Sequence, residues 1–66
     1  MLGQRREKLQ EFRKKYKLTQ EQMARKLDIT IAHYKAIEYG DRSPSLKLFK
    51  KMKEVFPKFS VDKIFL

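Results

Sequence analysis

The sequence predicts an all-α protein, a compact bundle of five short helices. Apolar residues recur three or four positions apart along successive short segments, which is the spacing of helices that bury one face. The residues that interrupt helices, Gly40, Pro44 and Pro57, fall between these segments. No stretch alternates apolar and polar residues as a half-exposed strand does. With 66 residues and no cysteine, the chain is expected to form one domain, 1–66, stabilised by apolar packing.

The first helix is expected at about 4–16. Leu9, Phe12 and Tyr16 recur at helical spacing and form its inner face. Acidic residues come early in this segment and basic residues late, which is the order that the helix dipole favours. Arg5 and Arg6 form either an ordered phosphate-binding arm or a frayed end of the helix, and fraying is favoured.

The second helix is expected at 20–27. Thr19 can cap its amino end, and Gln22, three residues further on, completes a capping box. Asp28 follows the helix and belongs to a residue type that tolerates the left-handed conformation of a tight turn. Thr30 is a second amino-terminal cap, so another helix is expected directly after this turn.

That third helix is expected at 31–39, because Gly40 is a favourable residue just beyond a helix end. Tyr34 and Ile37 are expected in the core, with the Tyr34 hydroxyl reaching the surface. Ser45 opens a fourth helix, whose expected inner residues are Leu46, Phe49, Met52 and Phe56. Ser60 caps a last short turn that holds Val61, Ile64 and Phe65.

Charge is the strongest feature of the composition. Seventeen lysine and arginine residues against eight acidic ones give a basic protein with a net charge of +9. Such an excess predicts attraction to polyanions that weakens steeply as salt rises. No apolar run approaches the roughly 20 residues of a membrane span, and the start, Met1–Arg6, lacks the apolar region of a signal peptide. The expected location is therefore the cytoplasm, with no membrane partner.

The sequence gives no sign of an enzyme. His33 is the single histidine, so it lacks the partners of a metal site or a catalytic triad. The acidic residues are scattered, and neither a phosphate-binding glycine loop nor a nucleophile motif is present. We expect no catalytic residue, no metal, no cofactor and no small-molecule substrate.

Residues 19–39 meet the requirements of a helix-turn-helix motif. This motif needs two short helices joined by a tight turn, and its second helix enters the DNA major groove. Ala24 supplies a small residue where the helices touch, and Asp28 supplies the turn residue. Apolar positions for the contact between the helices are also available: Met23, Leu27, Ile29, Tyr34 and Ile37.

With these residues in place, the chain resembles the phage-repressor and Cro type (Xre-like) helix-turn-helix transcriptional regulators. The resemblance runs from about residue 5 to 65 and rests on Leu18–Ala24, Leu27–Thr30, Ile37–Gly40 and Pro44–Leu46. It implies a lambda-repressor-like, five-helix DNA-binding domain whose ligand is double-stranded DNA. It also implies a regulator of transcription in bacteria, located on the nucleoid, and commonly a homodimer on a palindromic operator.

The resemblance further implies roles for individual residues. Those facing base edges would be Thr30, Ile31, Ala32, Lys35 and Ala36. Those contacting the DNA backbone would be Gln20, His33, Tyr39, Arg42, Ser43 and Lys47. A salt bridge between the first and third helices would join Arg13 and Glu38.

Some positions depart from the family pattern. Ile31, Ala32 and Ala36 have no hydrogen-bonding side chains, so Lys35 is the strong donor of the base-facing set and can address guanine. Apolar side chains contact thymine methyl groups instead, which predicts modest specificity for a thymine-rich element. Lys17 stands where relatives often have glycine, which predicts a small strain cost.

Two functions remain open at this stage. The first is a sequence-specific transcriptional regulator, a repressor that occupies its operator through a recognition helix at about 30–39. The second is a protein-interaction module, antitoxin-like or an anti-repressor, which the apolar Ile31, Ala32 and Ala36 favour. The basic loop and the lysine-rich surface favour DNA. The apolar segment 64–66 is expected either to seal the core or to meet a second copy in a homodimer.

Overall fold

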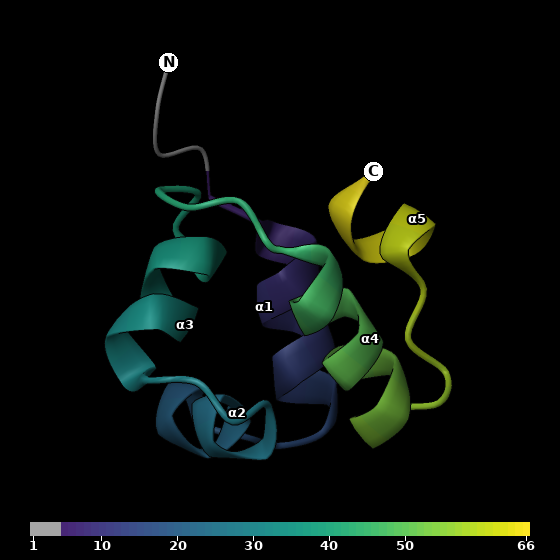
Figure 1. Cartoon of the computed structure of the whole chain (residues 1–66), viewed down its shortest axis with the longest axis horizontal. Helices are drawn as coiled ribbons and strands as arrows, with labels where there is room; N and C mark the ends of the chain where they lie inside the picture. The colour runs from purple at the N-terminus through teal and green to yellow at the C-terminus, as the bar shows by residue number, and fades with distance from the viewer. Residues whose placement is uncertain (1–4) are drawn as a thin grey trace.

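The computed structural model describes residues 5–66, which form five helices and, within that range, no strand (Figure 1). The helices are α1 (Glu7–Lys15), α2 (Gln20–Lys26), α3 (Ile31–Glu38), α4 (Leu46–Val55) and α5 (Val61–Phe65). The all-α prediction is therefore confirmed. The expected start of the first helix at Gln4 lies outside the described residues, and α1 begins at Glu7 because Arg5 and Arg6 are not helical.

Hydroxyl side chains cap the amino ends of four helices. In α2 the Thr19 hydroxyl accepts the Gln22 main-chain N–H at 3.1 Å, and the Gln22 side-chain oxygen accepts the Thr19 N–H at 2.9 Å. The predicted capping box is thus present. The other three caps each accept the N–H three residues further on and are Thr30, Ser45 and Ser60. These caps explain why α2 to α5 begin where they do.

The first three helices end in the same type of turn, in which one residue takes a positive φ. These residues are Lys17 (57°), Asp28 (59°) and Gly40 (86°). In each turn the following N–H donates to a carbonyl five residues earlier: Leu18 to Arg13, Ile29 to Ala24, and Asp41 to Ala36. The turn predictions for Asp28 and Gly40 are confirmed. Lys17 also takes the left-handed conformation, although its β-carbon makes this conformation unfavourable.

Replacing Lys17 with glycine is expected to raise the free energy of unfolding by up to about 1 kcal/mol, because glycine adopts a positive φ without steric cost. Chemical denaturation followed by circular dichroism would measure the change. Gly40→Ala is the matched opposite case, since it adds a β-carbon at a positive φ and should lower stability. A Lys17→Gly protein less stable than the parent would show that other Lys17 interactions outweigh the strain.

The core is formed by buried residues of α1 to α4 and of the segments that follow α2 and α4, while α5 packs against it with half-buried side chains. Its fully buried apolar residues are Leu9, Met23, Ala24, Leu27, Tyr34, Ile37, Leu48, Met52, Phe56 and Phe59. Phe12 of α1 packs edge-on against Phe56 and Phe59, with ring centroids 5.2 and 5.7 Å apart. α1 contacts α3 and α5, while α2 packs against α3 (Figure 1). This packing sets the pose of α3 relative to the rest of the domain.

Three expectations about side-chain burial need correction. Leu46 was expected in the core but is 68% exposed, because the buried stripe of α4 passes through Leu48 and Met52. The Tyr34 hydroxyl does not reach the surface: it is buried and has no hydrogen-bond partner within residues 5–66. Tyr16 was expected on the inner face of the first helix but is only partly buried: it is 38% exposed, although its ring packs on Phe56.

Candidate nucleic-acid interface

Helix α3 has one buried and one exposed face. Its buried residues are Tyr34, Ile37 and Glu38. On the other side Ile31, Ala32 and Lys35 are exposed, and they lie together because residues three and four apart share a face of a helix. We call these three residues the reading strip. It combines two apolar side chains with one cation.

Two further residues of the expected base-facing set border the reading strip. Thr30 is exposed, and its hydroxyl oxygen accepts the His33 N–H at 3.0 Å as the cap of α3. Its O–H remains free to donate outward. Ala36 is half-buried, and its carbonyl accepts the N–H groups of Asp41 and Arg42. Ala36 therefore presents less surface than the reading strip does.

Most of the expected backbone-contacting residues lie in α3 or in the segment that follows it, and they are exposed or half-buried. Arg42 and Ser43 are exposed in the loop between α3 and α4, and Lys47 is exposed in the first turn of α4. His33 and Tyr39 belong to α3 and its carboxyl end and are half-buried. The cations of this group can pair with phosphates on either side of a groove that receives α3.

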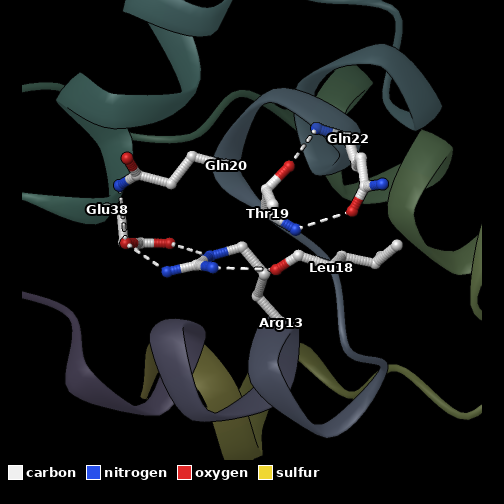
Figure 2. A network of polar contacts seen from close by, with 6 residues as sticks. All are labelled: Arg13, Leu18, Thr19, Gln20, Gln22 and Glu38. Carbon is white, nitrogen blue, oxygen red and sulfur yellow. Dashed lines mark hydrogen bonds and ion pairs between the residues drawn. The ribbon is translucent and has the colours of Figure 1, made fainter.

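The Gln20 side chain contacts α3 inside the fold. It is half-buried, and its amide nitrogen donates to Glu38 Oε1 at 2.9 Å (Figure 2). The amide is thus used to brace α3 from the start of α2. The family resemblance implies that Gln20 contacts a phosphate and helps to orient the reading helix. The bond to Glu38 fits the orienting role, although the sequence did not indicate Glu38 as the partner, and the phosphate contact stays a prediction.

The Glu38 carboxylate is the centre of a polar network that joins three helices (Figure 2). Arg13 Nε of α1 donates to Oε2 at 2.9 Å, and Arg13 Nη2 donates to Oε1 at 3.3 Å. Arg13 Nη1 also donates to the Leu18 carbonyl at 2.8 Å. The side chain of Glu38 is 0% exposed and that of Arg13 is 11% exposed. The structure thus brings the expected pair together, and both side chains are largely buried.

Burial and the neighbouring polar groups shift the pKa values of Glu38 and Tyr34. Burial pushes the pKa of Glu38 upward, but the hydrogen bond from Arg13, the adjacent Tyr34 hydroxyl and the hydrogen bond from Gln20 together outweigh it, so the pKa lies below the ordinary value of 4.5. Burial, and next the neighbouring Glu38 carboxylate, raises the pKa of Tyr34. Glu38 is therefore a buried anion at neutral pH, compensated mainly by Arg13.

The residues before α1 are attached to the end of α3, contrary to the expected fraying. The Arg6 main-chain N–H donates to the Glu38 carbonyl at 2.8 Å, and the Arg6 guanidinium donates to the Arg42 carbonyl at 3.1 Å. The Arg5 guanidinium lies 5.3 Å from the centroid of the Tyr39 ring, which is a cation–π distance. These contacts fix the carboxyl end of α3 and the loop after it.

The described residues offer neither a metal site nor a membrane-spanning helix. Within residues 5–66 no group of three or more histidine, cysteine or acidic side chains lies where a metal ion could be held. None of the described helices is both long and apolar enough to cross a membrane.

Comparison with protein families identifies this architecture. A family model described as helix-turn-helix matches residues 9–64. The chain therefore belongs to the phage-repressor type (Xre-like) helix-turn-helix family, as the resemblance in its sequence predicted, and it is a DNA-binding regulator. α2 and α3 are the two helices of the motif. Searches of curated proteins and of solved structures found no match.

Proposed function

We propose that this protein is a sequence-specific regulator of transcription that represses by occupying its operator, with α3 in the major groove. The observation that carries the proposal is the reading strip, an exposed face on a helix whose opposite face is fully buried. Because α3 is braced by α1 and α2 through Glu38, the strip can enter a groove as a rigid unit.

The strip suits a defined kind of base recognition. Lys35 can donate to the O6 and N7 atoms of guanine, while Ile31 and Ala32 can cover thymine methyl groups. Arg42 and Lys47 would then neutralise phosphates beside the groove, with Ser43 and the half-buried His33 and Tyr39 as further backbone contacts. Repression by occupancy requires no chemistry beyond this binding.

We also propose that two copies bind together on the nucleoid DNA of a bacterial cytoplasm. Leu66 is 84% exposed beside the half-buried Ile64 and Phe65, which supports an apolar contact between copies. A two-fold dimer would place its reading helices about 34 Å apart on successive major grooves. Sedimentation with and without DNA would test this, and a strictly monomeric protein in both states would contradict it.

Selection from a random duplex library at near-physiological salt tests the function itself. We expect a palindromic site whose half-sites lie about one helical turn apart. On logarithmic axes, the affinity for that site should fall linearly as the salt concentration rises. The slope should be several units, because each phosphate contact contributes about one unit. If no sequence is enriched over the input, α3 does not read bases. The apolar exposed Ile31 and Ala32 would then favour a protein partner as the ligand of this face.

The two apolar residues of the reading strip, Ile31 and Ala32, predict that individual thymine methyl groups contribute to binding. Replacing the thymines of the selected half-site with uracil should weaken binding about fourfold per contacted methyl, from about 0.8 kcal/mol per buried carbon. Fluorescence anisotropy with labelled duplexes would measure this change. Uracil placed outside the half-sites serves as the control, and equal affinity for both duplexes would remove methyl contact as the basis of recognition.

A further inference from the structure

A groove lies away from the reading strip, between α1 and the segment that leads from the end of α4 into α5. Its volume is about 530 Å³, and its lining residues come from α1 and from residues 58–64. No residue of α2, α3 or the loop between α3 and α4 takes part. In Figure 1 α3 lies at the left, α1 in the middle and α5 at the upper right. A molecule in this groove therefore leaves the reading strip uncovered.

The rim of the groove is cationic. Lys8 and Lys15 come from α1, two turns apart, and Lys58 and Lys63 come from the other wall. All four are exposed, and none forms an ion pair with another side chain of residues 5–66. Glu11 is the one acidic residue in the lining, so three positive charges are in excess. Charge of this density attracts an acidic ligand.

The floor of the groove is apolar. Phe12 and Ile64 are half-buried, and Tyr16 is 38% exposed, so part of each side chain remains open to a ligand. The rings of Phe12 and Tyr16 meet edge to face, with centroids 5.1 Å apart. An aromatic floor within a basic rim is complementary to a ligand with both negative and apolar groups.

We propose that this groove docks an acidic, amphipathic segment of a partner protein. Carboxylates of that segment would pair with the lysines of the rim, and an apolar side chain between them would cover Phe12 and Tyr16. This surface goes beyond the DNA-binding role, because the groove and the reading strip share no residue.

The chemistry of the groove disfavours two other occupants. A second copy of the chain that entered this groove would bring its own lysines and arginines against the rim. The contact between copies proposed above rests instead on the exposed Leu66, which does not line the groove. Duplex DNA could pair its phosphates with the lysines, but its backbone has no apolar group to cover the floor. An acidic protein segment satisfies both the rim and the floor.

Selection of displayed random peptides against the intact protein tests the proposal. We expect enrichment of sequences that combine several acidic residues with an aromatic or branched apolar residue. A selected peptide, titrated into isotope-labelled protein, should shift the amide resonances of residues 8–16 and 58–64 and leave those of 31–38 in place. Shifts confined to 31–38 would mean that the peptide imitates DNA on the reading strip, which would overturn the proposal.

Charge-reversal variants distinguish binding in the groove from attraction to the overall positive charge of the protein. The double variant Lys58→Glu and Lys63→Glu should bind the peptide at least about tenfold more weakly at near-physiological salt, where the Debye length is about 8 Å. The matched double variant Lys14→Glu and Lys26→Glu changes the net charge equally at exposed positions outside the lining, so it should retain binding within about twofold. Circular dichroism would confirm that both variants fold.

The remaining outcomes are equally decisive. Equal weakening in the two double variants would overturn the proposal, because the attraction would then be only overall charge. Selected peptides without an excess of acidic residues would overturn it as well. If single-stranded or duplex DNA shifts residues 8–16 and 58–64 while acidic peptides do not, the groove is a nucleic-acid site. None of these results depends on whether α3 reads an operator, so the two proposals fail separately.

Discussion

Replacing Glu38 with alanine is expected to lower the free energy of unfolding by about 3–5 kcal/mol, because it leaves the guanidinium of Arg13 largely buried without its counter-charge. A domain of 66 residues has a total stability of about 3–10 kcal/mol at the usual stability per residue. At the lower end of this range, much of the Glu38→Ala protein should therefore be unfolded at room temperature. Urea denaturation followed by circular dichroism would measure the loss.

Two comparisons separate the buried pair from a general effect of charge. Glu21→Ala removes the carboxylate of an exposed ion pair, in which Arg25 and Glu21 are 77% and 52% exposed, and should cost no more than about 1 kcal/mol. A double-mutant cycle of Arg13→Ala and Glu38→Ala should show strong coupling, because the second substitution removes a group that the first has already left unpaired. Additive effects of the two substitutions would exclude a structural role for the pair.

The network also predicts how stability depends on pH. Since the folded-state pKa of Glu38 is lowered, its contribution is fully present above the ordinary value of 4.5 and is lost as the pH falls through the folded-state value. The stability difference between the parent protein and Glu38→Gln should therefore narrow in acid below that window. A difference that stays constant between neutral and strongly acidic pH would contradict this prediction.

Lys35→Glu is expected to reduce affinity for the selected operator by about a hundredfold or more without unfolding the protein. Loss of a base contact accounts for about 1–3 kcal/mol, and the new carboxylate would be repelled by the DNA phosphates. Lys35 is exposed and makes no ion pair in the described part of the chain, so stability should change little. Fluorescence anisotropy and thermal melting would measure the two properties separately.

Lys26→Glu provides the matched control for this charge reversal. Lys26 is exposed at the end of α2 and lies outside the reading strip and its flanking residues, so its reversal should weaken binding only a few-fold at physiological ionic strength. Similar losses for the two variants would mean that Lys35 acts through net charge and not through a base contact. Lys35→Ala should relax the preference at one base pair of the half-site while other positions keep theirs.

Features that depend on neighbouring residues were predictable from sequence. Thr19 and Gln22 form a capping box, and Asp28 and Gly40 take positive φ values, because short side chains, or no side chain at all, favour these local geometries. The family resemblance also predicted that Arg13 and Glu38 form a salt bridge between helices. It did not indicate that the Glu38 carboxylate is fully buried, since burial depends on how three helices pack.

Features that depend on tertiary packing were not predictable in this way. Leu46 and Leu48 are the same residue type two positions apart, and only the packing of α4 in the fold decides that Leu48 is buried while Leu46 is exposed. Arg6 attaches to the end of α3 through carbonyl groups distant in sequence, which no periodic pattern indicates. The amide of Gln20 suits a phosphate or a carboxylate equally well, and only the packed structure brings Glu38 to 2.9 Å.

Exposure of the reading strip has a consequence for the divergence of related proteins. Ala32 and Lys35 are exposed and Ile31 is 37% exposed, so none of the three belongs to the buried core, while the orientation of their helix depends on Glu38 and the residues that bind it. Selection can therefore exchange Ala32 and Lys35 for other side chains with little loss of stability, and Ile31 with a somewhat larger one. A small library randomised at these three positions should yield folded proteins with many different operators, so the domain is a suitable scaffold for engineered repressors.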